Sequence, residues 1–164
     1  MANFNSFWLL ALLFIFHDFE ELVSVPTWVQ AHSAQFGRHT LFGGVGRSDI
    51  LAVGIWEEFC LYITIAMLAG HYHTPLLMAA TTVPYLCHLV MHIVFSLVKK
   101  SYVPGVFTAI IELPVTSYYL VVLMGSVTST IWQCLGVIIF AVVLFVGNLG
   151  FIHWGMQKLS RLIR

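Results

Sequence analysis

Five long apolar segments dominate this sequence and restrict what it can fold into. They run from about Phe4 to Val25, Ile50 to Ala69, Pro75 to Val98, Val106 to Met124 and Ile131 to Trp154. A helix of about 20 residues is needed to cross a hydrocarbon core that is roughly 30 Å thick. Of the 164 residues, 60% are hydrophobic and only 9% are charged, which excludes an ordinary water-soluble domain. We predict an all-α, polytopic membrane bundle of five transmembrane helices, forming a single domain over residues 1–164.

The basic residues predict how this bundle is oriented. All seven Lys and Arg residues follow the first, third or fifth segment: Arg38, Arg47, Lys99, Lys100, Lys158, Arg161 and Arg164. With five spans, these positions fall on one side of the membrane. The positive-inside rule then places the C-terminus in the cytoplasm and the N-terminus outside.

The longest connection is expected on the cytoplasmic side, at about residues 26–48. Trp28, His32 and Phe36 are spaced for one helical face, which predicts an interfacial loop or a short helix in the plane of the membrane surface. Such a segment anchors the protein or covers a site, and the sequence leaves both roles open.

Glutamate and histidine side chains inside the expected spans are the second unusual feature. The glutamates are Glu20, Glu21, Glu57, Glu58 and Glu112, and the histidines are His17, His88 and His92. Ionisable groups within a bilayer are costly and usually mark functional sites. No Lys or Arg lies among them in the sequence, so the carboxylates need protons, imidazole partners or bound cations.

Helical spacing gathers several of these groups on common faces. His17, Glu20 and Glu21 are related by i, i+3 and i+4, so they project from one side of the first helix. His88 and His92 are one turn apart on the third helix in the same way. We therefore expect the two faces to meet inside the bundle.

The second and fourth helices contribute carboxylates as well. Glu57 and Glu58 point about 100° apart, so we expect one of them to face the bundle, and the sequence does not decide which. Glu112 lies between Thr108 and Thr116 in a polar stripe at i, i+4 and i+8. These groups also lie at a similar depth in the membrane, counted from the cytoplasmic helix ends at about 1.5 Å per residue. The depths are ~12 Å for Glu57, ~10 Å for Glu112, ~10 Å for His92, ~16 Å for His88 and ~13 Å for His17.

A metal centre explains this inventory better than hydrogen bonding or ion transport alone. Imidazole with carboxylate suits iron, zinc or manganese, and helical bundles that supply Glu and His from facing helices hold two ions. We predict two divalent ions, iron or zinc with manganese as a further option. The expected ligands are His17, Glu20, Glu21, Glu57, Glu58, His88, His92 and Glu112, with Glu21 and Glu58 as catalytic residues. The alternatives are a neutral polar network between helices and a path for protons or ions.

The function that follows is a membrane-embedded metal-dependent enzyme. Its partners are the lipid bilayer and a lipid-like small-molecule substrate, with no nucleic acid, and the oligomeric state stays open. Iron would activate oxygen for hydroxylation or desaturation, whereas zinc would activate water for hydrolysis. The abundance of carboxylate slightly favours iron and redox chemistry. A metal-ion or proton carrier and a non-catalytic assembly module with a structural metal remain as alternatives.

Several neighbouring residues are expected to support the site. Asp18 points away from the face of His17 and would contact the metal ligands without binding the metal itself. His153 and Asn148, near the end of the last span, could reach the rim of the site, and Tyr62 could donate a hydrogen bond to Glu58.

Two short motifs resemble those of a known family. The segment His17-Asp18-Phe19-Glu20-Glu21 and the segment Tyr102-Val103-Pro104-Gly105 resemble the family of bacterial membrane proteins named for its HXXEE motif, which also has a further histidine and a YXPG motif. The resemblance extends from the first span to the start of the fourth. It implies that His17, Glu20 and Glu21 form a unit, with His88 or His92 as the further histidine, in a bacterial inner (plasma) membrane. It implies no substrate or reaction.

Overall fold

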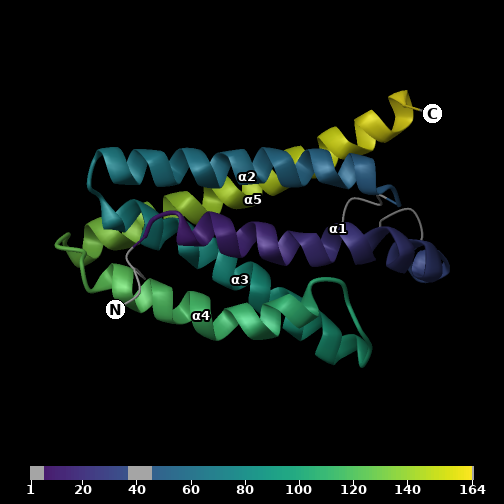
Figure 1. Ribbon diagram of the computed structural model, residues 1–164, viewed down its shortest axis with the longest axis horizontal. Coiled ribbons are helices and arrows are strands. Elements are labelled where there is room, and N and C mark those ends of the chain that lie inside the picture. The colour runs from purple at the N-terminus through teal and green to yellow at the C-terminus, as the bar shows by residue number, and fades with distance from the viewer. Residues whose placement is uncertain (1–5, 37–45, 164) are drawn as a thin grey trace.

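The computed structural model describes residues 6–36 and 46–163, which form five helices and no other regular element. The helices are α1 (Leu9–Phe36), α2 (Ser48–His71), α3 (Pro75–Lys99), α4 (Val106–Met124) and α5 (Ile131–Leu162). They lie side by side along the long axis of the molecule (Figure 1). Within the described part, α2, α3, α4 and α5 are long and apolar enough to cross a membrane. The all-α prediction is confirmed, and the chain is a membrane helical protein.

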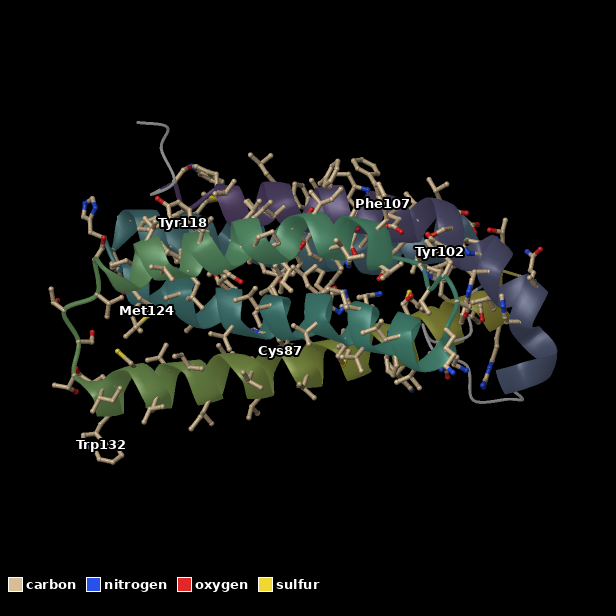
Figure 2. All side chains as sticks on the ribbon, turned by 90° about the horizontal axis from the view of Figure 1, so that it is seen from below. Cys87, Tyr102, Phe107, Tyr118, Met124 and Trp132 are labelled. Atoms are coloured by element: carbon tan, nitrogen blue, oxygen red, sulfur yellow. The ribbon has the colours of Figure 1, made fainter. Side chains whose placement is uncertain are left out.

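The first helix differs from the prediction. It does not end at Val25 but continues through Pro26 to Phe36, so the first part of the expected interfacial segment extends α1. Residues 37–45 and the basic residue Arg38 lie outside the described part. Figure 2 shows the last turns of α1 bending away from its first half, as a proline inside a helix produces. Trp28 Nε1 donates to the carbonyl of Tyr102 at 3.0 Å, which holds this extension against the connection before α4.

The basic ends of the helices gather at one end of the bundle. The connection from α3 to α4 and the end of α5 lie there, while the connections from α2 to α3 and from α4 to α5 lie at the other end (Figure 1). Arg47, just before α2, donates from Nη1 to the carbonyl of Ile163 at 3.2 Å. The last helix also runs on to Leu162 rather than ending near Trp154 as predicted, because its polar end continues the same hydrogen-bond ladder.

Local sequence signals explain where α3 and α5 begin. Pro75 begins α3, where its missing N–H costs no hydrogen bond. Thr130 and Gln133 form a capping box at the start of α5. Pro84 and Pro114 lie inside α3 and α4 without ending them. Interior prolines are common in membrane helices because neighbouring helices satisfy the freed backbone groups.

The helices pack so that α1 and α3 face each other across the interior. α3 contacts α2, α4 and α5, and α1 contacts α2 and α4. The aromatic core joins Phe14, Tyr62 and Tyr85, with ring centroids of Phe14 and Tyr62 4.7 Å apart. Large apolar side chains are exposed on the outside of every helix, for example Phe16, Trp56, Val94, Ile110 and Phe140. Such a surface suits hydrocarbon rather than water.

A close approach of α2 to α5 depends on Gly54. A Cβ at this position would lie 2.8 Å from Ile152 Cγ2 and 2.9 Å from Met156 Sδ. A side chain at this position would have to displace Ile152 and Met156, so glycine lets α5 lie close against α2.

Candidate metal centre

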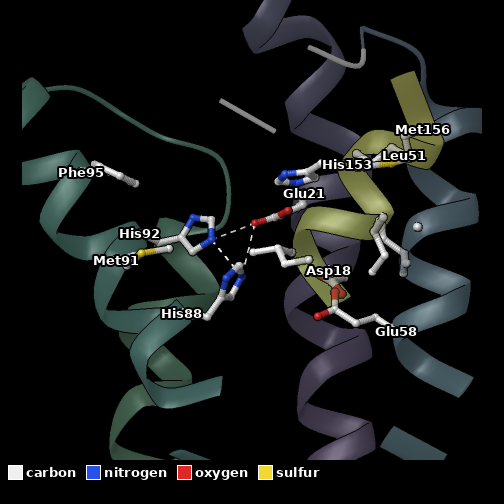
Figure 3. Close-up of a pocket in the computed structure, with 14 residues that line it drawn as sticks. Asp18, Glu21, Leu51, Glu58, His88, Met91, His92, Phe95, His153 and Met156 are labelled. Carbon is white, nitrogen blue, oxygen red and sulfur yellow. Dashed lines mark hydrogen bonds and ion pairs between the residues drawn. The ribbon is translucent and has the colours of Figure 1, made fainter. Parts of the chain in front are cut away.

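Four side chains from two helices converge in the interior. They are His17 and Glu21 of α1 and His88 and His92 of α3, and one ligand atom from each lies within 4.8 Å of all the others. Figure 3 shows Glu21, His88 and His92 pointing toward one another. His17, Glu21 and His92 are buried and His88 is half-buried. We call this set the His₃Glu group.

The distances suit a shared ion. Glu21 Oε1 lies 2.9 Å from His92 Nε2, 3.7 Å from His17 Nε2 and 3.8 Å from His88 Nε2. His88 Nε2 and His92 Nε2 are 3.0 Å apart. Ligand atoms that each bind a tetrahedral ion at about 2.0–2.2 Å lie about 3.3–3.6 Å from one another. The observed separations bracket this range.

The tautomer of His92 follows from its backbone partner. Its Nδ1 lies 2.7 Å from the carbonyl oxygen of Pro104. A carbonyl oxygen only accepts, so Nδ1 carries the hydrogen and donates. In the neutral ring, Nε2 then presents a lone pair toward Glu21 and His88. This arrangement orients a metal-binding histidine.

His17 is oriented by a chain of two hydrogen bonds. The Thr108 hydroxyl donates to Glu20 Oε2 at 2.7 Å. Its oxygen therefore accepts from His17 Nδ1, which lies 2.9 Å away. The Nε2 of His17 is left as the nitrogen that faces the His₃Glu group. The chain from Glu20 through Thr108 to His17 matches the carboxylate–histidine pairs behind metal ligands.

The His₃Glu group thus brings hydrogen-bond acceptors together without enough hydrogen-bond donors. Within residues 6–36 and 46–163, the buried His17 Nε2 and Glu21 Oε1 have no hydrogen-bond partner. Lone pairs that face one another repel unless a proton or a metal ion lies between them. Because three imidazoles and one carboxylate match the ligands of zinc and iron, the group could hold a metal ion.

Glu20 has a different structural role from its neighbour Glu21. Its carboxylate accepts from the backbone N–H of Thr108 at 2.7 Å and of Phe107 at 3.3 Å, which are unpaired donors at the start of α4. The Tyr102 hydroxyl donates to Glu20 Oε1 at 2.8 Å. Partial burial raises the pKa of Tyr102, which keeps this donor protonated. Glu20 therefore caps α4 from α1.

The YXPG motif wraps the His₃Glu group. Gly105 has a φ of +83°, and a Cβ there would lie 2.7 Å from His92 Nδ1 and 3.1 Å from Glu21 Oε1. Only glycine allows both this backbone conformation and this approach. Tyr102 holds Glu20 and Pro104 holds His92, so each named residue of the motif serves the same site.

The structure separates the remaining expected ligands from the His₃Glu group. Glu58, rather than Glu57, faces the interior and lines a cavity. Glu57 is exposed and accepts from Asn148 Nδ2 at 3.2 Å, so Asn148 lies away from the centre. Glu112 is buried and accepts from the Tyr85 hydroxyl at 2.6 Å. Of the eight expected ligands, the structure brings together His17, Glu21, His88 and His92.

A cavity of about 140 Å³ opens beside the centre. Glu21, His88 and His92 form part of its wall, and His153 reaches it as expected. Asp18 and Glu58 point toward each other on the wall below (Figure 3). The rest of its lining is mostly apolar and comes from α2, α3 and α5: Leu51, Gly54, Ile55, Met91, Phe95, Leu149, Ile152 and Met156.

Sequence reasoning missed several supporting residues. Thr108 was grouped with Glu112, whereas its partners are His17 and Glu20. No sequence signal marked Tyr85, whose hydroxyl donates to Glu112. The carbonyl of Pro104 was missed because a backbone acceptor leaves no signal in composition, although the YXPG motif marked its place.

Comparison with known proteins identifies the family. No curated protein and no solved structure matches the chain. A family model described as "Protein of unknown function with HXXEE motif" matches residues 8–120, from the start of the first helix to the last turns of α4. This range contains the His₃Glu group and the connection that wraps it. The resemblance is confirmed: the chain belongs to the HXXEE-motif family.

Proposed function

We propose that this protein is a membrane-embedded metal-dependent enzyme that acts on a lipid-like substrate. One observation carries the proposal: the buried His₃Glu group forms part of the wall of a mostly apolar cavity. A metal ion held there would face a space that a hydrophobic molecule could occupy. A buried apolar pocket with a few converging polar groups is the usual form of a small-molecule site.

We propose one divalent ion in the His₃Glu group, with iron favoured. Four protein ligands fill a tetrahedral zinc site, whereas iron accepts further ligands and would keep positions open. Iron with dioxygen and a reductant would support hydroxylation or desaturation of an alkyl chain. A second ion stays a prediction. Its ligands would come from Asp18 and Glu58, whose side chains point toward each other on the wall of the cavity.

A structural zinc site is the second candidate. The complete set of four protein ligands favours it, because structural zinc sites are closed. In that case the metal would join α1 to α3, and the protein would serve membrane assembly. The cavity beside the ligands favours the enzyme.

We also propose that α1 is the fifth span, which puts the N-terminus outside and the C-terminus in the cytoplasm of a bacterial inner membrane. The first half of α1 carries Asp18, Glu20 and Glu21, which lower its hydropathy. These side chains are turned toward other helices or the cavity, so they do not oppose insertion of α1 among α2 and α4.

Metal analysis of the purified protein tests the first step. We expect about one equivalent of iron per chain in the wild type, and a small fraction of that in Glu21→Gln and His92→Ala. His153→Ala is the matched control, because this histidine lines the same cavity but lies outside the His₃Glu group. Equal metal content in all four proteins would refute the site.

Lipid analysis of the host membrane tests the reaction. Cells that express the wild type should contain lipids that have gained one oxygen atom or lost two hydrogen atoms. Cells that express Glu21→Gln should lack these products. If the wild type retains its metal but leaves the lipids unchanged, the structural zinc role replaces the enzyme.

A further inference from the structure

We propose that a hydrocarbon chain of a membrane lipid enters the protein sideways, between α3 and α5, and lies with its reactive end at His88 and Glu58. This inference rests on the proposed function, because it names the route by which a lipid would reach the His₃Glu group. A second cavity adjoins the first.

The two cavities form one path. The second cavity has a volume of about 150 Å³. It lies toward the end of the bundle that holds the connections from α2 to α3 and from α4 to α5. It shares Glu58, His88, Met91 and Leu149 with the cavity beside the metal centre. Space therefore continues from the interior of the bundle to a ligand of the His₃Glu group.

The outer part of the second cavity opens on the lipid-facing side. Cys87 and Met91 of α3 and Val146 of α5 line it and are exposed. Figure 2 labels Cys87 between the ribbons of α3 and α5. If these helices span the membrane, the molecules outside this mouth are the acyl chains of lipids. No exposed charged side chain lines the cavity among the described residues.

The inner part is sealed from bulk lipid. Phe14, Tyr62 and Tyr85 line the same cavity, yet their side chains are only 4%, 2% and 2% exposed. The lining thus changes from apolar at the mouth to polar at Glu58 and His88. An alkyl chain attached to a polar or reactive group matches this order, whereas a water-soluble ligand would have to cross hydrocarbon first.

Photolabelling of the full-length protein in phospholipid nanodiscs tests the route. The probe is a palmitic acid analogue with a diazirine near its terminal methyl group, and adducts are mapped by mass spectrometry. Exposed residues such as Val94 would be labelled by any lipid that surrounds the protein. Adducts on the buried Tyr62 or Tyr85 require the chain to enter.

Two variants block the mouth from opposite sides. Val146→Trp on α5 and Cys87→Trp on α3 should each lower the yield of Tyr62 and Tyr85 adducts roughly tenfold, the effect of about 1.4 kcal/mol of lost affinity. Ile139→Trp is the matched control, since Ile139 lies on α5, is 61% exposed and lines none of the described cavities. It should leave the adducts unchanged.

The result separates this inference from the proposed function. Wild-type protein without adducts on the buried tyrosines overturns the route, even if the protein retains its metal. Adducts that persist in both blocking variants overturn it as well. Adducts that form in the wild type and disappear only in the two blocking variants support the route. The same adducts should also form in His92→Ala. If the wild type gives these adducts but binds no metal, the site for the hydrocarbon chain is supported and the proposed enzyme is refuted.

Discussion

Thr108 shows how much of the candidate site depends on residues that bind no metal. Its hydroxyl donates to Glu20 and accepts from His17, so one side chain fixes the tautomer of a candidate ligand. Thr116, two turns further along α4, is also buried, but its hydroxyl has no hydrogen-bond partner among the residues described. The two threonines therefore form a natural comparison.

We expect Thr108→Val to weaken metal binding about 10- to 100-fold, because the loss of a hydrogen bond to a ligand typically has an effect of this size. The measurement is competition with a chelator of known affinity. Thr108→Ser keeps the hydroxyl and should bind as the wild type does. Thr116→Val is the control and should also leave the affinity unchanged. A Thr108→Val protein with wild-type affinity would remove the orienting role of this residue.

At the scale of the elements, α1 and α4 are joined by a cap that crosses between helices. The residue before α4 is Gly105, which has no side chain to cap the first turn. Glu20 of α1 supplies the missing acceptor for the N–H groups of Phe107 and Thr108. The positive end of the helix dipole also favours this carboxylate. The HXXEE motif therefore supplies both part of the His₃Glu group and the cap of the next helix.

Hydrogen exchange can measure this cap. Glu20→Ala should speed exchange of the Phe107 and Thr108 amides about fivefold, since loss of a helix cap costs about 1 kcal/mol. Glu57→Ala is the matched control, because Glu57 is exposed, accepts from the side chain of Asn148 and caps no helix. Amides that exchange equally fast in both variants and the wild type would contradict the capping role.

At the scale of the whole molecule, the basic side chains are distributed unevenly along the bundle. The described basic residues Arg47, Lys99, Lys100, Lys158 and Arg161 all lie at one end of the bundle. The turns at the other end, 72–74 and 125–130, carry no Lys or Arg. An asymmetry of this kind orients a bundle during insertion.

Cysteine accessibility in intact cells tests the orientation. In a background where Cys60 and Cys87 are replaced by Ala, His73→Cys should react with a membrane-impermeant thiol reagent. Ser101→Cys, at the other end of α3, should react only after the membrane is opened. The opposite pattern would invert the topology, and reaction of both from outside would exclude α3 as a span.

Much of this protein was determined by its sequence alone. The beginnings of α3, α4 and α5 were predicted correctly at Pro75, Val106 and Ile131, because apolar length and turn residues act locally. The pairing of His88 with His92 and of His17 with Glu21 also followed from helix geometry, since residues four apart share a face.

The tertiary structure decided which neighbour of each pair enters the site. Glu21 faces the histidines while Glu20 caps α4, and Glu58 faces the cavity while Glu57 faces outward. These choices depend on how each helix is rotated against its partners, which is set by contacts between residues far apart in the chain. Helical periodicity determines the angle between two side chains of one helix, but packing determines what each of them meets.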